Sequence, residues 1–195
     1  MDRNEINELL DAIIQGAEDR YAEIMQSFQV PIFHYCYHIL GNRFEAEDAT
    51  QEVFIKAYRQ IRKYNREMPF AAWLCKVAYH HCIDLIRKRK WIRLLPFLDV
   101  AKPSQSNIEQ HIENVYFSET VYLAMAALSV EERTLLLLRG VEKRTYDEIS
   151  QIMNKNAASL RKKFERTAAK FRSAYSLLEK GGVTHEDTKR IAQEY

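Results

Sequence analysis

The stretch from Lys155 to Arg172 limits the possible folds more than any other part of the chain. It holds seven Lys or Arg residues and a single acid, Glu165, and a short amphipathic segment, 146–153, precedes it. Two short helices joined by a tight turn, the second strongly basic, are typical of a helix-turn-helix, whose second helix enters the DNA major groove. The sequence therefore predicts a DNA-binding motif near the C-terminal end.

The composition favours an all-helical protein. Of the 195 residues, 47% are hydrophobic, which is enough for packed cores, whereas Gly (5) and Pro (4) are scarce. Scarce Gly and Pro favour helices over strands and turns. The formal net charge is +2, so any binding of nucleic acid has to depend on local basic clusters. No apolar run approaches the ~20 residues that cross a bilayer, and we expect an intracellular protein without membrane insertion.

The three cysteines, Cys36, Cys75 and Cys82, do not form a C-x-x-C pair. Their odd number and apolar neighbours argue against a disulfide framework and against a zinc site. We therefore expect three buried thiols in a reducing compartment.

The spacing of apolar residues predicts two helical domains. The expected helices span 5–29 (two helices broken near Gly16), 30–40, 46–64, 70–90, 115–128, 131–139, 146–153 and 157–178. Weak periodicity with several Pro and Ser residues indicates a flexible linker. The predicted organisation is a domain at 1–90, a linker at 91–114, a helix-turn-helix domain at 115–180 and a polar tail at 181–195. The tail is either a solvated appendage or a regulatory contact.

Several short motifs occur in a specific order along the chain. The upstream half reads LGN at 40–42, AEDATQEVF at 46–54, WLCKVA at 73–78 and IDLIRK at 83–88, and the downstream half reads LSVEER at 128–133 and EISQIMNKNAASLRKK at 148–163. With these motifs in this order, most of residues 20–180 resembles the extracytoplasmic-function (group IV) sigma factors of bacterial RNA polymerase. Each motif is weak alone, but their order and spacing make the resemblance specific.

The resemblance implies an alternative sigma factor that directs promoter-specific initiation in the bacterial cytoplasm. It implies three partners: core RNA polymerase through its clamp and flap regions, promoter DNA, and an anti-sigma factor that can hold the protein at the membrane. No P-loop, nucleophile elbow or metal-ligand set is present, so we expect no catalysis, no cofactor and no metal. The alternative is a helix-turn-helix regulator that is not a polymerase subunit, which would leave the motifs of 46–90 unexplained.

The segment 46–56 would bind the polymerase clamp. Asp48, Gln51 and Glu52 share one side of a helix because they are three and four residues apart, and such a carboxylate-amide stripe is suited to pairing with Arg on a partner. The alternative is a solvated helix face. The expected polymerase-binding residues are Glu47, Asp48, Gln51, Glu52, Phe54 and Lys56.

The segment 63–90 would recognise and open the −10 promoter element. Opening a duplex calls for aromatic surfaces that stack on bases and for cations that bind phosphates. Trp73 can instead pack in the core of the domain. Phe70 has the same two alternatives, a place in the core or a contact with the −10 element. The expected −10 residues are Lys63, Tyr64, Phe70, Trp73, His80, His81, Asp84, Arg87 and Lys88.

The second helix of the helix-turn-helix would read the −35 element as duplex. Arg and Lys make the commonest specific contacts to guanine, while other cations touch only phosphate. The expected −35 residues are Asn156, Ala157, Ser159, Leu160, Arg161, Lys162, Lys163 and Arg166, with Leu160 lying beneath.

Two positions depart from the family pattern. His80 stands where the family usually has Asn, which bears on the −10 base preference. Lys155 stands in the turn where an apolar residue normally packs, so its side chain has to extend to solvent or the turn has to differ. Because of these two residues, the −10 and −35 preferences of the family do not predict the promoter sequence that this chain recognises.

Overall fold

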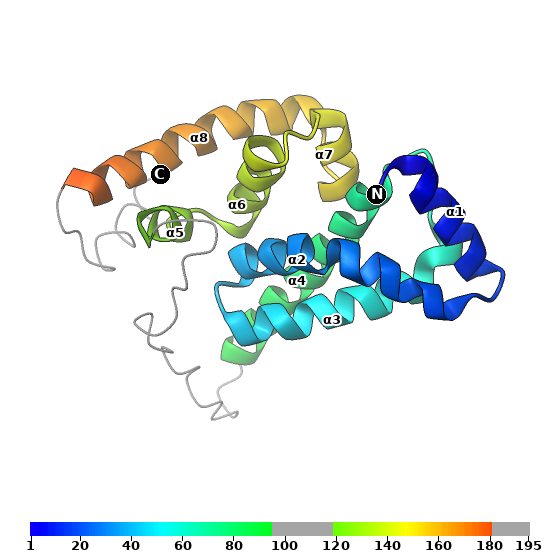
Figure 1. Cartoon of the computed structure of the whole chain (residues 1–195). Coiled ribbons are helices and arrows are strands. Elements are labelled where there is room, and N and C mark those ends of the chain that lie inside the picture. Colours follow the sequence, from blue (N-terminus) through cyan, green and yellow to red (C-terminus); the bar gives the residue numbers. More distant parts are fainter. Residues whose placement is uncertain (95–118, 181–195) are drawn as a thin grey trace.

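The structure, a computed structural model, describes residues 1–94 and 119–180, and every regular element within these ranges is helical. Figure 1 shows the arrangement. The α-helices are α1 (Arg3–Ile14), α2 (Tyr21–Leu40), α3 (Arg43–Gln60), α4 (Phe70–Leu94), α5 (Glu119–Ala126), α6 (Val130–Leu136), α7 (Tyr146–Met153) and α8 (Ala157–Lys180). Short 3-10 turns occur at Glu18–Arg20 and Ile61–Lys63, and a π-helical turn at Leu137–Val141. The predicted all-α fold is confirmed.

Helices α1 to α4 form an N-terminal unit. Helix α2 packs against both α3 and α4, and α3 packs against α4. The inner side of α3 is made of small residues, because Ala46, Ala49 and Ala57 are at most 1% exposed. Such residues let the neighbouring helices approach closely. Large aliphatic side chains such as Ile39 and Leu74 then fill the space between the helices.

The boundary between α2 and α3 follows from its own residues. Gly41 ends α2 in the left-handed conformation (φ +71°), and its N–H donates to the carbonyl of Tyr37. This backbone conformation favours glycine. Asn42 then caps α3, because its side-chain oxygen accepts from the N–H of Glu45 at 3.0 Å. Gly41 and Asn42 thus end one helix and begin the next.

Helix α2 differs from its prediction at Pro31. A new helix was expected to begin at Val30, but the structure has one continuous helix over Tyr21–Leu40 with Pro31 inside it. A proline within a helix costs about 3 kcal/mol. Ile24 and Ile32, on either side of it, are fully buried, and this packing offsets the cost.

Helices α5 to α8 form a C-terminal unit. Ser129 and Glu132 make a capping box at the start of α6, and Thr145 and Glu148 make another at the start of α7. The helix that begins at Val130 does not stop at Gly140 as expected, because a π-helical turn carries it to Val141. The predicted start of the preceding helix, at Val115, lies outside the described residues.

The linker and the tail lie largely outside the described residues. The exception is 91–94, which was predicted to belong to the linker but continues α4. Trp91 to Leu94 contain neither Gly nor Pro.

The two units pack directly on each other. Helix α7 contacts α4, and α6 contacts α2. Leu135, Leu138 and Ile149 of the C-terminal unit belong to the same buried cluster as Ile39 and Leu74 of the N-terminal unit. Helix α8 packs on the side of α6 and α7 that faces away from the N-terminal unit, along the top of Figure 1.

Candidate functional site

The outer face of α3 carries an exposed polar stripe. Asp48, Gln51 and Glu52 are all exposed to solvent, as their spacing predicts. Glu47 is half-buried and pairs with Arg43 at 2.9 Å. The structure therefore brings four of the expected polymerase-binding residues to the surface of one helix.

Phe54 and Lys56, from the same predicted set, have other environments. Phe54 is 2% exposed and lies in the core, where its carbonyl accepts a hydrogen bond from the Tyr21 hydroxyl at 2.8 Å. Lys56 is partly exposed, and its Nζ lies 2.7 Å from Nδ1 of His81 on α4. A direct surface contact by Phe54 is wrong for this conformation, since the side chain faces inward.

Phe44 was missed by the sequence analysis. It is the most exposed large hydrophobic residue in the described parts of the chain, at 75%. Phe44, Asp48, Gln51 and Ile55 follow one another at intervals of three and four residues, which places them on one side of α3. Ile55 is 43% exposed. The same periodicity read one turn earlier would have identified Phe44.

The aromatic residues before and within α4 form a cluster. Tyr64, Phe70 and Trp73 have ring centroids 5.2 to 5.4 Å apart. Phe70 is 3% exposed and also packs edge-on against Phe28, so it supports the other two rings. Tyr64 and Trp73 are partly exposed. Only these two rings of the cluster present surface on which a base can stack.

The exposed face of α4 carries His80, Asp84 and Arg87, which recur at intervals of four and three residues. Asp84 and Arg87 are 3.8 Å apart. Lys63 and Lys88 are also exposed. His80, Arg87 and Lys88 thus place one imidazole and two cations on the exposed surface of α4, while Lys63 lies in the 3-10 turn that precedes the helix.

His81 differs from its neighbour because it is buried, at 8% exposure. Burial, and then the nearby Lys56 ammonium, lower the pKa of His81. A direct contact between His81 and DNA is therefore wrong for this conformation. His80 and His81 were predicted to act together, because which of two adjacent helical residues faces inward depends on the position of α3.

The start of α8 is arranged as expected for a recognition helix. Asn156 caps it, and its side-chain oxygen accepts from the N–H groups of Ala158 and Ser159 at 3.0 and 3.2 Å. Leu160 is buried, at 1% exposure. The exposed members of the predicted −35 set are Asn156, Ser159, Arg161, Lys162 and Arg166, while Ala157 and Lys163 are partly buried.

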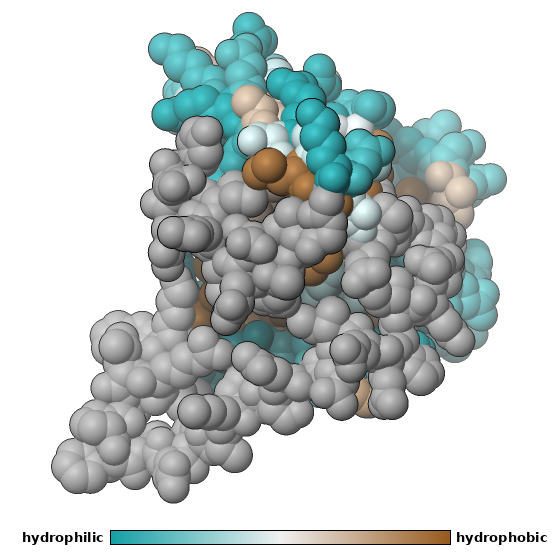
Figure 2. Space-filling model, turned by 90° about the vertical axis from the view of Figure 1, so that its left-hand side faces the viewer, coloured by the Kyte–Doolittle hydropathy of each residue, from teal (hydrophilic) through white to brown (hydrophobic). Residues whose placement is uncertain are grey.

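Figure 2 views the molecule from the side of the α8 C-terminus. The upper surface, where α8 runs, is hydrophilic, and apolar residues appear beneath it. This matches the amphipathic pattern of the helix, in which Thr167 and Ala174 are buried while Arg172 is exposed.

Contacts within the C-terminal unit orient some of its cations. The guanidinium groups of Arg139 and Arg161 lie 5.1 and 5.3 Å from the ring centroid of Tyr146, which is favourable for a cation over an aromatic face. Lys163 pairs with Glu131 at 2.7 Å. Tyr146 was not predicted to act on the recognition helix, because its partner Arg161 lies beyond the turn.

The side chain of Lys155, in the turn between α7 and α8, extends to solvent. Asn154 ends α7 in the left-handed conformation (φ +55°), a conformation that Asn adopts more readily than most residues. The Lys155 side chain is about half-exposed, and its Nζ lies 3.6 Å from Glu131. The cation therefore reaches solvent and does not enter the core.

A cleft of about 730 Å³ lies between the two units. Lys63, Trp73 and Lys76 line its N-terminal side, and Asn154 and Lys155 line its other side. Residues predicted to read the −10 element thus face the turn of the helix-turn-helix across one open space.

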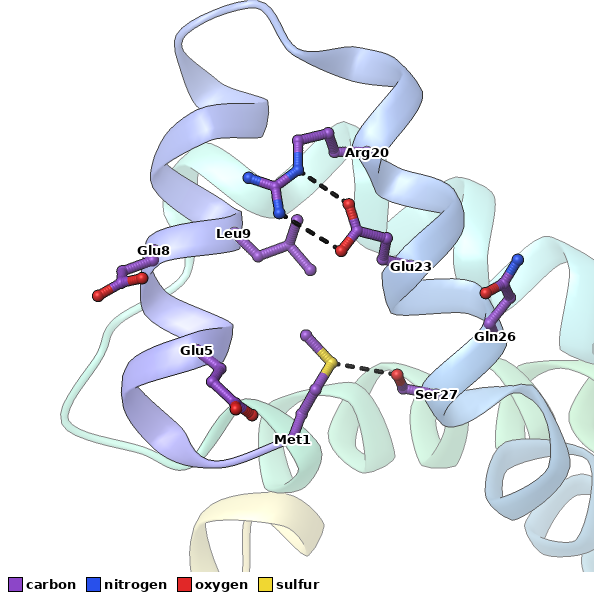
Figure 3. A pocket seen from close by; sticks show the side chains of 8 residues that line it. All are labelled: Met1, Glu5, Glu8, Leu9, Arg20, Glu23, Gln26 and Ser27. Atoms are coloured by element: carbon purple, nitrogen blue, oxygen red, sulfur yellow. Dashed lines mark hydrogen bonds and ion pairs between the residues drawn. The ribbon is translucent and has the colours of Figure 1, made fainter.

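A second hollow, of about 470 Å³, lies between α1 and α2 (Figure 3). Two of its carboxylates are engaged within the protein. Arg20 donates two hydrogen bonds to Glu23, at 2.8 and 3.3 Å, and Glu5 accepts from the N–H of Asp2 in the capping box of α1. These contacts explain the two side chains without a ligand.

The three thiols lie as predicted, since Cys36, Cys75 and Cys82 are free and buried. Within residues 1–94 and 119–180, no helix is long and apolar enough to span a bilayer.

Two family models match the chain. Sigma-70 region 2 matches residues 24–92 and Sigma-70 region 4 matches residues 118–171. The first match covers α2 to α4 with the polar stripe and the aromatic cluster, and the second covers the helix-turn-helix. A helix-turn-helix regulator that is not a polymerase subunit would not explain the first match.

Two proteins that are similar to this chain are sigma factors. The chain is 28% identical to the ECF RNA polymerase sigma factor SigW of Bacillus subtilis (strain 168) over 164 residues, which covers 76% of this chain and 85% of SigW. The fold is similar to that of the sigma factor RpoE of Bartonella quintana, solved with the anti-sigma factor NepR, with a TM-score of 0.66 and 14% identity over 80% of this chain and 96% of that one.

A second solved structure is CnrH in complex with the cytosolic domain of CnrY. Its TM-score is 0.62 and its identity 15%, over 93% of this chain and 100% of that one. These two solved structures show the shared fold. The two family matches and the likeness to SigW show that the chain belongs to the extracytoplasmic-function sigma factors of the sigma-70 family, non-catalytic proteins that direct transcription initiation by RNA polymerase.

Proposed function

We propose that the outer face of α3 binds the clamp of core RNA polymerase. The exposed stripe of Asp48, Gln51 and Glu52 supports this, because carboxylates at such spacing can accept charge-assisted hydrogen bonds from Arg side chains. Phe44 and Ile55 supply apolar surface at the two ends of the stripe. Exposed aromatic residues beside polar ones are frequent anchors of protein interfaces.

The −10 element is assigned to the exposed face of α4 and to the residues that precede it. Trp73 and Tyr64 offer rings for stacking, and a stacked base contributes roughly 1–3 kcal/mol. Two such contacts offset the few kcal/mol needed to extrude a base. Arg87 and Lys88 then hold phosphates, and His80 stands at the position where the family motif usually has the Asn that bears on the −10 base preference.

The −35 element is assigned to the N-terminal half of α8. Ser159, Arg161, Lys162 and Arg166 are exposed there, and a cation that forms a bidentate contact with guanine discriminates by about 1–3 kcal/mol. Arg161 is the strongest candidate for base contact because Tyr146 restricts its position. Asn156 acts through the helix cap.

The same proposal includes the organisation of the chain and its partners. Residues 1–90 would form the polymerase and −10 domain, 91–114 a tether, 115–180 the −35 domain and 181–195 a tail. The clamp and flap of the polymerase, promoter DNA and an anti-sigma factor would be its partners in the bacterial cytoplasm. RpoE of Bartonella quintana was crystallised with an anti-sigma factor, which supports looking for one here.

Transcription in vitro tests these assignments. Sigma-free core polymerase is mixed with this protein on a fragmented genomic template pool, and the RNA 5′ ends are sequenced. Discrete starts that share −35 and −10 elements are expected. An absence of defined starts, together with no complex on gel filtration with core polymerase, contradicts the proposed polymerase contact.

Two pairs of variants separate the surfaces. Asp48→Arg is expected to weaken the binding of core polymerase, whereas Arg59→Asp, at an exposed position near the other end of α3, should have little effect. Arg161→Ala is expected to reduce initiation at promoters with an intact −35 element by about five- to hundredfold. Arg172→Ala, three turns further along α8, is the control. Equal effects within either pair contradict the corresponding assignment.

A further inference from the structure

Helix α1 lies beside segment 61–69, the stretch of chain that joins α3 to α4. The helix precedes residues 24–92, which match Sigma-70 region 2, and none of the residues assigned above lies on it. It contacts the 3-10 turn at the start of the segment, and Figure 1 shows the two side by side. Leu9 and Leu10 of α1 are buried in the same core cluster as Ile61. Apolar burial therefore places α1 against the start of the segment.

Arg66 makes a side-chain link between segment 61–69 and α1. Its Nη1 and Nη2 donate to the two carboxylate oxygens of Asp11, the first of them at 3.0 Å. A guanidinium and a carboxylate that meet through two hydrogen bonds fix each other's orientation as well as their separation. The hydrogen bond from Arg66 lowers the pKa of Asp11, so the pair stays ionised at neutral pH.

Two further arginines bind backbone carbonyls across the same boundary. Nη2 of Arg3 donates to the carbonyl of Arg66 at 2.6 Å. Nη2 of Arg62 donates to the carbonyl of Ile14, the last residue of α1, at 3.1 Å. The last carbonyls of a helix lack partners within the helix and carry its partial negative charge, which suits a guanidinium. Arg66 is thus held through its side chain and through its backbone.

Hydrogen bonds within the segment connect Arg66 to Tyr64. The side-chain oxygen of Asn65 accepts from the N–H of Glu67 at 2.9 Å, and its amide nitrogen donates to the Glu67 carboxylate at 2.8 Å. The Tyr64 hydroxyl donates to the carbonyl of Met68. Arg66 lies in the middle of this turn, so a displacement of Arg66 also displaces Tyr64.

The ion pair has more effect on local order than on the stability of the fold. The side chains of Arg66 and Asp11 are 43% and 50% exposed, and exposed ion pairs contribute little to stability. Fixing a backbone segment costs conformational entropy, however, and a segment that is ordered beforehand does not incur this cost when it binds. The rings of Tyr64 and Trp73, 5.2 Å apart, gain from such order if they stack on bases.

We propose that α1 braces segment 61–69, with Asp11, Arg3 and Arg66 as positioning residues for the capture of −10 bases by Tyr64. This role rests on the −10 surface proposed above. The three residues act on the segment and not on a base, since they hold its backbone where the Tyr64 ring lies against Trp73. Loss of the brace slows promoter opening and leaves the contact of α3 with core polymerase intact.

The rate of promoter opening tests the brace. The full chain and core polymerase are mixed with a duplex promoter from the transcription experiment that carries 2-aminopurine in its −10 element. Asp11→Asn keeps the size of the side chain and should slow opening about two- to fivefold. Glu23→Gln is the control, because it breaks a similarly exposed ion pair, with Arg20 at 2.8 Å, outside the segment. Opening by Asp11→Asn at or above the wild-type rate overturns the proposal.

Exchange of the two charges separates positioning from a direct contact of Arg66 with DNA. Asp11→Arg and Arg66→Asp each break the ion pair, and the double variant restores it in the opposite orientation. The double variant should open the promoter faster than either single variant, as the coupling of two interacting residues requires. If the loss in Arg66→Asp persists in the double variant, Arg66 binds DNA itself and the brace is overturned.

A template whose −10 region is already mispaired separates base capture from a general defect. No base has to be extruded from such a duplex, so Asp11→Asn should form the complex at the wild-type rate, with wild-type affinity for core polymerase. A defect that persists on this template overturns the role in base capture.

Hydrogen exchange in the free protein decides the brace independently of transcription. The N–H groups of Glu67 and Met68 are hydrogen-bonded within the segment, and they should exchange faster in Asp11→Asn than in Glu23→Gln. Equal exchange in the two variants overturns the brace. If even the wild type opens no promoter, the proposed function fails, while the exchange rates still decide whether α1 orders the segment.

Discussion

Lys56 of α3 and His81 of α4 are joined by a contact of 2.7 Å between Nζ and Nδ1. A lysine ammonium only donates, so Nδ1 of the imidazole accepts and is unprotonated. Burial and the neighbouring ammonium both lower the pKa of His81, which keeps the ring neutral. This contact ties the helix that carries the polymerase stripe to the helix that carries the −10 face.

Adjacent histidines of α4 should therefore respond differently to substitution. His81→Ala leaves the partly buried Lys56 ammonium without this acceptor and should lower the free energy of unfolding by roughly 1–3 kcal/mol. His80→Ala, at an exposed position, should change it by no more than about 0.5 kcal/mol but alter initiation on promoters with single-base changes in the −10 element. Urea denaturation and transcription assays measure the two effects. A purely functional effect of His81→Ala would contradict the structural role.

Acidification should lower the stability of the folded protein through His38. The pKa of His38 is lowered to about 4 by burial, and further by His34 and Arg133, whereas an exposed histidine titrates near about 6.5. The folded protein then binds fewer protons at this residue than the unfolded chain, so this contribution to stability is complete above about pH 6.5 and is lost as the pH falls towards 4. Between pH 7 and 5 the loss is about 2 kcal/mol.

Urea denaturation recorded as a function of pH measures this loss. His38→Gln removes the titrating group and should flatten the pH dependence, while His81 contributes a change of the same sign within the N-terminal unit. An unchanged pH profile in the His38→Gln variant contradicts the assignment.

Phe44 should contribute to the affinity for core polymerase. Phe44→Ala removes an exposed ring and should weaken binding about five- to thirtyfold, as expected for an anchor residue that loses 1–2 kcal/mol. The melting temperature should stay the same, because the side chain is 75% exposed. Fluorescence anisotropy with labelled protein measures the affinity. Val141→Ala, at another exposed apolar position, is the control, and an equal loss there would argue against a specific contact.

Asn156 should affect stability and DNA binding separately. Asn156→Ala removes the cap of α8 and should cost about 1 kcal/mol, seen as a lower melting temperature. Asn156→Asp keeps a capping oxygen, so stability is retained, but it adds a negative charge beside the DNA phosphates. Affinity for −35 duplex should then fall, measured at a fixed salt concentration because such binding depends strongly on salt. Loss of stability in the Asp variant contradicts the capping role.

Much of the fold was predictable because its signals are local. The capping box of Ser129 and Glu132 and the stop at Gly41 depend on residues within one turn of each other. The stripe of Asp48, Gln51 and Glu52 follows from helical spacing alone. The continuity of α2 through Pro31 was not predictable, because packing against other helices offsets a local cost.

The helical class, the order of the helices, the helix-turn-helix and, through its motifs, the family could all be predicted from the amino-acid sequence. Each of these depends on interactions between residues that are near in sequence, which are similar in any context. The exposure of His80, the burial of His81 and the inward orientation of Phe54 became clear only from the packed fold. These outcomes depend on the position of a second helix that is far away in sequence, and packing alone sets that position.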